Sequence, residues 1–241
     1  MRTTRLFFAF VWVCVLALPV LAQNGLKGSG TIVEKNYPVQ SFDQLKIEGI
    51  FNVHLTQGNS ESVRLTIDDN LVPYIDVKNE GNRLVIKWEK DKNKSINNVK
   101  SDMYITFKNL DEINLQHVGK FISSNTLSAK ELDIKVNSVG ETTLDMNCDK
   151  LKINHNGVGS VNLKGKATTA TLDCSGVGGL KAFDLIVENL KLQSSGVGSA
   201  EVTARKEISI TASGVGSVRY RGDAKAVQLN TSGIGKVRKV S

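Results

Sequence analysis

The sequence contains few proline, cysteine and aromatic residues, and each shortage narrows the range of possible folds and functions. Only three prolines occur in 241 residues, at Pro19, Pro38 and Pro73. Because proline removes a donor from a β-ladder, its absence after residue 73 leaves the rest of the chain free to form sheet. Three cysteines are too few for a disulfide framework. Aromatic residues make up 6% and do not alternate with clustered basic residues, so we expect no nucleic-acid partner.

The first 22 residues have the pattern of a secretory signal peptide. Arg2 and Arg5 precede an apolar run over residues 6–18, and Ala22 supplies a small residue for cleavage. The run is shorter than the ~18 residues that argue for a membrane span, so we expect cleavage rather than a retained anchor, and no transmembrane span afterwards. Removing two of the 31 basic residues leaves 29 against 24 acidic ones, a modest net charge of +5 that is spread along the chain.

A glycine turn recurs seven times in the second half of the chain. The clearest copies read GVGS at 157–160 and 196–199, and SGVGS at 213–217. The second glycine lies at position 119, 140, 159, 178, 198, 216 or 235, so the spacing stays between 18 and 21 residues. Such a regular series is typical of a repeat architecture. A phosphate-binding loop would need G-x-G-x-x-G before a helix, and no copy has the third glycine.

Aliphatic residues recur at fixed positions in the repeats. The column six residues before the second glycine contains Ile113, Ile134, Ile153, Leu172, Leu192, Ile210 and Leu229. A second apolar column lies eight residues before the glycine, and polar residues occupy the positions between. This period of two predicts a β-strand before each turn, and a second strand follows the turn.

The fold class that these features predict is all-β: a single-stranded parallel β-helix (β-solenoid) with rungs of about 19 residues and an N-terminal β region. A right-handed coil is expected because parallel crossovers usually have that hand. At ~4.8 Å per step, seven rungs span about 29 Å. We interpret Gly-Val-Gly as the corner of each rung, with the valine or isoleucine inserted into the core.

The chain divides into four segments. They are the signal peptide (1–22), a linker with the first strand (23–38), an N-terminal β region (39–110) and the solenoid repeats (111–241). In the N-terminal region, strand-like stretches such as QLKIEGIFNVHL and RLVIKW alternate with polar turn sequences. We expect this region to cover the first rung, since a solenoid must protect its terminal sheet edge.

The order of several short motifs resembles one known family. Ser41-Phe42-Asp43, IEGIFNV at 47–53, Gln57-Gly58, NRLVI at 82–86 and Tyr104-Ile105 precede the serial glycine turns. This order is similar to that of the exported bacterial family of auto-transporter adhesins with a head GIN domain (DUF2807), over residues 39–235. The resemblance implies a β-helical cell-envelope protein with an adhesin-like role, and it transfers no catalytic residues.

No cluster of titratable residues emerges from the expected stacking. His155 and Cys174 both lie four residues before their glycines and should be neighbours, but the rest of that column is small or apolar, so we interpret both as core residues. Cys148 lies in another register, which argues against a disulfide with Cys174. Asp173 is flanked in register by amides rather than by a second carboxylate. We therefore predict no enzymatic activity, no cofactor and no catalytic or metal-binding residues.

Polar residues form two further columns, three and five residues before the glycine. Amides and hydroxyls at ~4.8 Å spacing match a polysaccharide or a partner strand, although residues that merely face solvent or bond one another would give the same pattern. The candidate ligand-facing ladder consists of Asn137, Asn154, Asn156, Asp173, Ser175, Gln193, Ser195, Thr211, Ser213, Asn230 and Ser232.

Functions of different classes remain open at this point. The first is a non-enzymatic, adhesin-like or structural module of the cell envelope that presents the ladder or the N-terminal region to glycans or envelope proteins. The alternatives are an enzyme that acts on envelope carbohydrate at a lateral-surface site, and an envelope-stress or signalling accessory that pairs through its last rung. In each case we expect an exported protein, located in the periplasm, on the outer-membrane surface or secreted.

Overall fold

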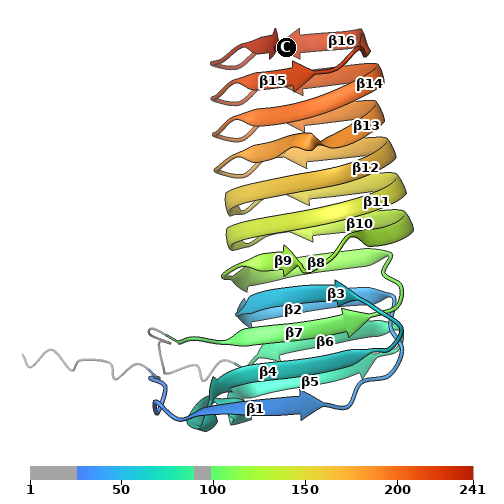
Figure 1. The fold of residues 1–241 in the computed structure, drawn as a ribbon. Helices are drawn as coiled ribbons and strands as arrows, with labels where there is room; N and C mark the ends of the chain where they lie inside the picture. Colours follow the sequence, from blue (N-terminus) through green and yellow to red (C-terminus); the bar gives the residue numbers. More distant parts are fainter. Residues whose placement is uncertain (1–25, 90–98, 241) are drawn as a thin grey trace, which may run out of the picture.

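Strands that pair in parallel with their equivalents one repeat away build the molecule (Figure 1). The computed structural model describes residues 26–89 and 99–240. The proposed signal peptide, residues 1–22, lies outside the described residues. The strands form a β-solenoid of about seven turns, which confirms the predicted fold class. No helix in the described residues is long and apolar enough to cross a membrane.

The repeats stack in the register that the aliphatic columns predicted. Ile134 pairs with Ile153, and Leu172 pairs with Leu192. The column six residues before the glycine is buried from Ile113 to Ile210 and forms the centre of the core. The solenoid strands are β8 (Glu112–Val118), β9 (Phe121–Ser123), β10 (Leu127–Val136), β11 (Val139–His155), β12 (Val158–Cys174), β13 (Leu180–Ser194), β14 (Ala200–Ala212), β15 (Val218–Arg221), β16 (Lys225–Thr231) and β17 (Val237–Lys239).

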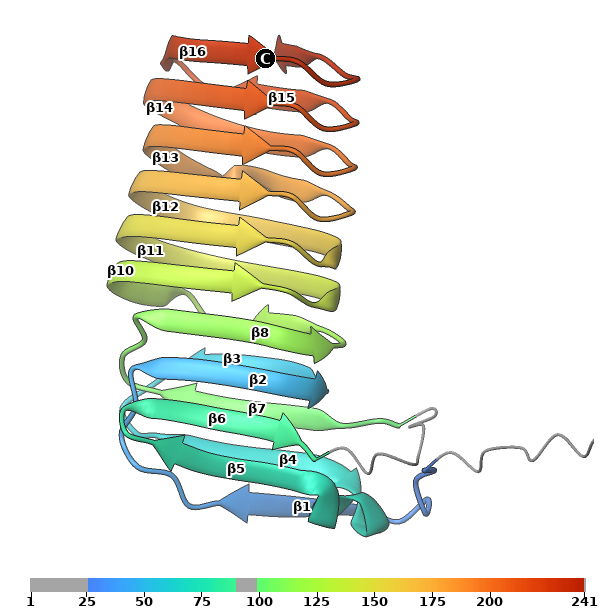
Figure 2. The same ribbon diagram turned by 180° about the vertical axis from the view of Figure 1, so that it is seen from behind.

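Each central rung is one long strand that bends around the core. β11 and β12 have 17 residues each. Their pairing continues through the bend opposite the glycine turns and skips only Asp149 and Thr168. Cys148 and Ala167 pair at this bend, so small side chains line its inner side. The two strands expected in each repeat are therefore joined at this edge, and the glycine turn is the sharper of the two corners (Figure 2).

The valines at the glycine corners are exposed, and the prediction that they insert into the core is wrong. In one rung, the exposed fractions of His155 and Val161 are 4% and 0%, while that of Val158 is 52%. The inward–outward alternation of the strand continues through the turn, so Gly157 and Gly159 take the inward-parity positions and Val158 points out. The corner role of the glycines is nevertheless clear, because Gly159 has a φ of 141° and a Cβ there would overlap the carbonyl oxygen of the corner glycine one rung before.

In the N-terminal region the order of rungs in space differs from their order in the chain. β2 pairs in parallel with both β6 and β8, and β3 pairs with both β7 and β9. The rung β2–β3 therefore lies between β6–β7 and β8–β9 (Figures 1 and 2). The elements are β1 (Ile32–Tyr37), β2 (Gln44–Ile50), β3 (Asn52–Gln57), β4 (Ser62–Asp68), the 3-10 helix η1 (Asp69–Tyr74), β5 (Ile75–Glu80), β6 (Arg83–Trp88) and β7 (Asp102–Phe107).

Antiparallel strands close this end of the solenoid. β1 pairs with β4, β4 with β7, and β5 with β6, all antiparallel. The change of direction ends the parallel stack, and the side chains of Leu65 and Ile67 in β4 are fully buried in the core. At the other end, Val227 and Leu229 of β16 are 61% and 43% exposed, although they occupy core columns.

Candidate functional site

The column five residues before the glycine forms a straight row on one flank of the solenoid. Each residue of this column follows a buried residue of the core column in the same strand, so its polar side chain points away from the core. Asn154 pairs with Asp173, Asp173 with Gln193, Gln193 with Thr211, and Thr211 with Asn230. Gln193 and Asn230 are exposed, and the other three are partly exposed. The structure therefore brings this half of the predicted ladder together.

The column three residues before the glycine forms a second row beside the corner. All six of its members, Asn137, Asn156, Ser175, Ser195, Ser213 and Ser232, are exposed. Their main chains hold the register, because the amide of Ser175 donates to the carbonyl of His155 at 2.9 Å and that of Ser195 to the carbonyl of Cys174 at 3.0 Å. In the described part of the chain, none of the eleven ladder side chains hydrogen-bonds to another protein group. Their donors and acceptors face solvent.

The column five residues before the glycine also contains a charged residue, one rung before Asn154, that the predicted ladder does not include. Lys135 of β10 pairs in register with Asn154 and therefore belongs to the same column. Its ammonium lies 3.2 Å from the carboxylate of Glu112, which partly neutralises it. Counting five residues back from Gly140 would have found it. From the rung of Asn154 onward, Asp173 is the one charged member of the ladder.

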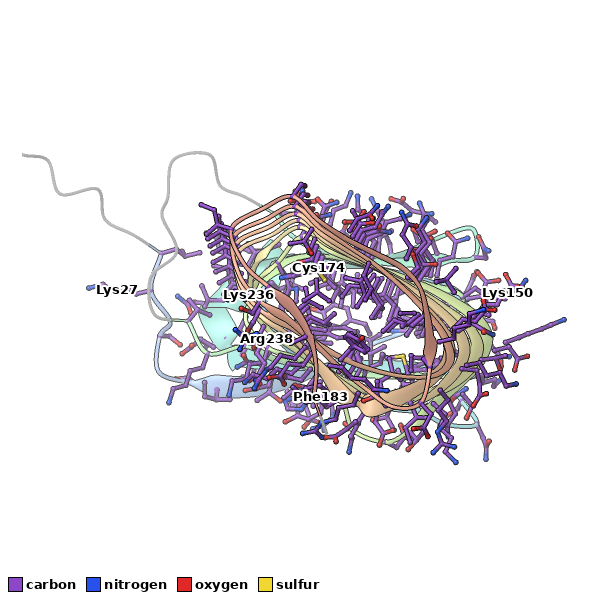
Figure 3. All side chains as sticks on the ribbon, turned by 90° about the horizontal axis from the view of Figure 1, so that it is seen from above. Lys27, Lys150, Cys174, Phe183, Lys236 and Arg238 are labelled. Atoms are coloured by element: carbon purple, nitrogen blue, oxygen red, sulfur yellow. The ribbon has the colours of Figure 1, made fainter. Side chains whose placement is uncertain are left out.

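The corner beside the ladder carries a row of exposed aliphatic side chains, which we call the valine ridge. Main-chain bridges hold its members in register from rung to rung. The first six are 47–52% exposed and Ile234 is 77% exposed. Seen along the axis, the corners of successive rungs lie above one another (Figure 3). The ridge consists of Val118, Val139, Val158, Val177, Val197, Val215 and Ile234.

Buried polar side chains line the inside of the corners. The Nδ1 atom of His117 lies 2.9 Å from the hydroxyl of Ser138, and its Nε2 atom has no partner. His155 pairs in register with Cys174, as predicted, and both of its ring nitrogens are buried without a well-formed hydrogen bond. Burial lowers the pKa of His117 from 6.5 to about 4 and lowers that of His155. Nearby main-chain groups oppose both shifts only in part.

Both described cysteines are free, as the register argument predicted. Burial, with a smaller effect of Asp149, raises the pKa of the Cys148 thiol to about 11. Burial, with a smaller effect of Asp173, raises that of Cys174 to about 12. Since the thiolate is the reactive form, neither cysteine is a nucleophile at neutral pH.

These pKa shifts predict slow alkylation of the folded protein. With iodoacetamide at pH 8, each thiol should react at least about tenfold more slowly in the folded protein than in guanidinium, where its pKa returns to about 8.5. Mass spectrometry of the mature protein would follow both sites, and the Cys148→Ala variant would isolate Cys174. A folded-state rate equal to the denatured rate at either site would contradict the burial described here.

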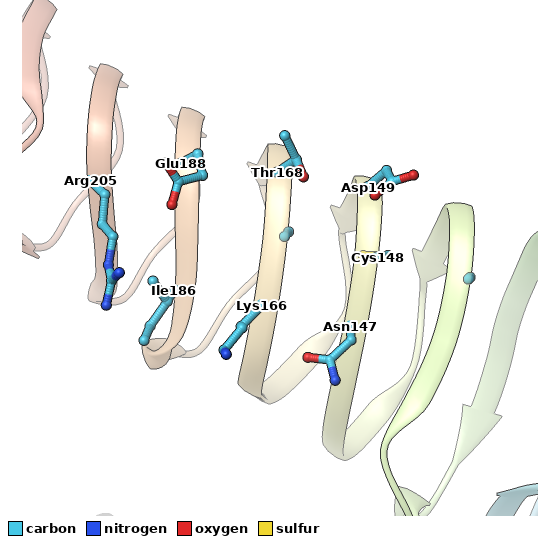
Figure 4. Close-up of a pocket in the computed structure, with 10 residues that line it drawn as sticks. Asn147, Cys148, Asp149, Lys166, Thr168, Ile186, Glu188 and Arg205 are labelled. Carbon is cyan, nitrogen blue, oxygen red and sulfur yellow. The ribbon is translucent and has the colours of Figure 1, made fainter.

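An open hollow of about 520 Å³ lies on the bend opposite the glycine corners. Its side chains come from successive rungs and include Cys148, Lys166, Glu188 and Arg205 (Figure 4). The carboxylate of Glu188 forms an ion pair with Lys206 at 3.2 Å. Asp149 and Glu188 lie two rungs apart, with the rung of Thr168 between them, which corresponds to roughly 10 Å along the axis. No three His, Cys, Asp or Glu residues among those described form a group suited to a metal ion. The sequence reasoning did not identify this hollow.

The family follows from a comparison with family models. The model described as "Putative auto-transporter adhesin, head GIN domain" (DUF2807) matches residues 41–224, well over half of the chain. The chain belongs to this family. The resemblance drawn from the motif order is thereby confirmed. No curated protein matches the sequence.

Solved structures of similar proteins have the same fold as this GIN-domain protein. One from Bacteroides fragilis NCTC 9343, described as a putative adhesin, has 30% identity and a TM-score of 0.86, covering 90% of this chain and 100% of that chain. A putative adhesin from Parabacteroides merdae ATCC 43184 has 25% identity and a TM-score of 0.66 at the same coverage. A putative lipid binding protein from Parabacteroides distasonis ATCC 8503, at 22% identity and a TM-score of 0.69, covers the same shares and shows the fold alone.

Proposed function

We propose that this GIN-domain protein is an exported, non-enzymatic, adhesin-like module of the bacterial cell envelope, and that its polar ladder is the ligand-facing surface. One observation carries the proposal: eleven amide, hydroxyl and carboxylate side chains are stacked in register on a rigid scaffold, with no hydrogen-bond partner in the described protein. A polar row that only stabilised the stack would bond along it. The ladder instead keeps its hydrogen-bonding capacity for solvent or a ligand.

A glycan is the ligand that fits this surface best. Amides and hydroxyls both donate and accept hydrogen bonds, as sugar hydroxyls do. The rungs repeat every ~4.8 Å, so a linear polysaccharide that lies along the axis would meet equivalent groups at regular intervals. Since the parallel ladder already fixes the backbone, binding would cost little ordering of the protein. An envelope protein is the alternative partner, and the binding test below includes it.

Several observations favour binding over catalysis. The carboxylates near the hollow belong to rungs two steps apart, and one of them is paired with Lys206. Burial disfavours both the cysteine thiolates and the protonated forms of His117 and His155. Catalysis requires at least two converging titratable groups. The family description as adhesins agrees with a binding role. The basic and apolar leader at residues 1–22 supports export.

The test is a binding screen of the mature protein, residues 23–241, against a glycan array and envelope extracts. The variant Asn156→Lys/Ser195→Lys places two long cations on exposed ladder positions and should weaken binding at least about tenfold. Its matched control is Asn147→Lys/Thr168→Lys, which adds the same charge at exposed positions of the opposite bend. Circular dichroism would confirm that all three proteins are folded.

The outcomes separate the candidate surfaces. Loss of binding in the ladder variant alone supports the proposal. Binding that survives in the ladder variant contradicts it, and loss in the control variant alone would move the site to the hollow. If the mature protein binds no glycan and no envelope component, the binding function itself is refuted in favour of a structural role.

A further inference from the structure

The valine ridge is an apolar surface without a partner in the described chain. Each of its seven β-branched side chains is about half exposed or more, and main-chain bridges keep them in one line. At ~4.8 Å per rung the line extends over about 29 Å. Monomeric proteins seldom expose a contiguous apolar row, and such rows usually mark interaction surfaces. The glycines on both sides of every ridge residue in the central rungs leave the row free of neighbouring side chains that would shield it.

The surface around the middle of the ridge is neutral and built from small residues. The position after the second glycine holds Ser160, Gly179, Ser199 and Ser217 in the four central rungs. On the other side, the column three residues before the glycine holds Ser175, Ser195 and Ser213 in three of these rungs. A partner could therefore approach the ridge closely without removing a charge from water, which is the costly step in forming an interface.

In the two columns that adjoin the ridge, charges lie only near its ends. In the column after the second glycine, Lys120 and Glu141 lie in the first two rungs, and Lys236 lies in the last. The amide of Asn162 donates to the carboxylate of Glu141 at 2.7 Å and holds it on the outer face. Opposite charges thus lie five rungs apart, with neutral residues between them, on the same side of one apolar line.

We propose that the ridge is the interface of a symmetric homodimer in which a second copy packs antiparallel, ridge against ridge. The two-fold axis crosses the ridge between the rungs of Val177 and Val197. Val177 then meets Val197 of the second copy, Val158 meets Val215, and Val139 meets Ile234. Two copies share the same rung spacing, so each ridge matches the other along its length, and the same patch is used twice, as in most soluble dimers.

Charge complementarity selects this arrangement over its alternatives. The two-fold places Glu141 opposite Lys236 of the second copy, and the same pair forms again at the other end. A shift that centres the axis on Val177 would instead set Lys120 against Lys236, two like charges. A parallel dimer, with the axis along the ridge, would set Glu141 against the neutral column of Asn137. Among registers that pair most of the ridge, the antiparallel one centred between Val177 and Val197 is the one that pairs opposite charges twice.

The dimer leaves the ladder available. Because the two-fold axis crosses the ridge, the polar flanks of both copies lie on the same side of the dimer. Two ladders side by side would double the polar surface and allow bivalent attachment to a repetitive ligand. The dimer itself rests on the ridge and its flanking charges alone, and its test uses no ligand.

Analytical ultracentrifugation of the mature protein tests the proposal. We expect a dimer at about 100 μM or below. Val177→Lys/Val197→Lys puts four ammonium groups at the centre of the interface and should give a monomer with an unchanged circular dichroism spectrum. Asn147→Lys/Thr168→Lys, on the opposite bend, is the control and should remain dimeric. A monomeric wild-type protein, or a dimer that survives the ridge lysines, overturns the proposal and leaves the ridge to another partner.

A charge swap tests the register. Glu141→Lys sets an ammonium group against that of Lys236 in the second copy and should raise the dissociation constant by about tenfold or more. Glu141→Lys/Lys236→Glu restores opposite charges and should return the dissociation constant to near the wild-type value. If the double variant dimerises no better than Glu141→Lys, the antiparallel register is wrong.

Discussion

Gly178→Ala is expected to lower the free energy of unfolding by at least about 3 kcal/mol, whereas Gly179→Ala should change it by less than about 0.5 kcal/mol. The two glycines are neighbours in the same corner, yet the structure places very different demands on them. Gly178 has a φ of 138°, and a Cβ there would overlap the carbonyl oxygen of Gly159 in the preceding rung. Gly179 needs no positive φ, and its Cβ would meet only an ordinary contact, 3.7 Å from the Ser199 oxygen.

The large effect has two sources that add. Positive φ strains any residue with a Cβ, and the overlap with main chain cannot be relieved by a side-chain rotation. Relief would require the two rungs to separate, which would stretch the parallel hydrogen bonds that the amide of Val177 donates to Gly157 and the amide of Gly159 donates to Val177, now 2.9 and 2.8 Å. Because each rung of a solenoid contacts mainly its neighbours, the damage should centre on β12 and β13.

Urea unfolding of the mature protein, followed by circular dichroism, measures the difference between the two variants. Hydrogen exchange would show whether the amides of β12 and β13 lose protection first, since solenoids do not always unfold in one step. Similar effects of the two substitutions would contradict the corner geometry. A third variant, Gly198→Ala, should repeat the Gly178 result, because Gly198 has a φ of 149° and the same overlap with the preceding rung.

The solenoid could be predicted from the sequence because its contacts repeat. A parallel stack puts the same position of each repeat in one row, so the column from Ile113 to Ile210 reports a spatial contact directly. The polar ladder could be placed by the same count, and the pairing of His155 with Cys174 followed from it. These inferences needed only the repeat length and the period of a strand.

The outward orientation of the corner valines is also encoded in the sequence, although it differs from the predicted insertion into the core. Leu172 and Cys174 lie on the core side of their rung, so even steps from Gly178 face inward and Val177, an odd step, faces outward. The hydrophobicity of valine favours burial, but the inward–outward alternation of the strand continues through the turn and directs the valine side chain outward. An apolar residue at an outward position was the signal for an interaction surface.

The rung order in the N-terminal region had no comparable signal. β2 and β3 lie between β6–β7 and β8–β9, so each of them pairs with strands that are distant from it in the sequence. This region has no repeated glycine turn that would mark equivalent positions. Its order depends on non-local pairing of six- and seven-residue strands with similar apolar patterns. The hollow at the far bend was missed for a related reason, since its shape depends on side chains from several rungs.

Acidification from pH 7 to pH 4.5 is expected to lower the free energy of unfolding by about 2–3 kcal/mol through His117 alone. Burial lowers the pKa of this histidine from 6.5 to about 4 in the folded protein. Between pH 6.5 and about pH 4, the imidazole of His117 is mostly protonated in the unfolded chain and mostly neutral in the folded protein. Stability therefore rises with pH across this window and is lost as the pH falls through it. His155, whose pKa is lowered for the same reason, acts in the same direction.

The variant His117→Gln removes the titration and keeps a polar group near Ser138. It should be less stable than the wild-type protein at pH 7, because the imidazole packs against Phe121 at a centroid distance of 6.2 Å. Its loss of stability between pH 7 and pH 4.5 should be smaller by about 2 kcal/mol. Urea unfolding at several pH values gives both quantities, and the NMR signal of the His117 ring in the wild-type protein reports its pKa directly.

Acidic residues supply the control for the pH window. Lys150 lowers the pKa of Glu131 below its ordinary value of 4.5, so this carboxylate contributes stability that is lost only at lower pH. Glu131→Gln should therefore leave the change between pH 7 and pH 4.5 intact, while His117→Gln reduces it. If both variants keep the full wild-type loss, or if the ring titrates near 6.5, His117 is not the buried neutral group that this corner requires. A wild-type protein equally stable at both pH values would contradict the burial of His117 and His155 together, since both shifts have the same sign.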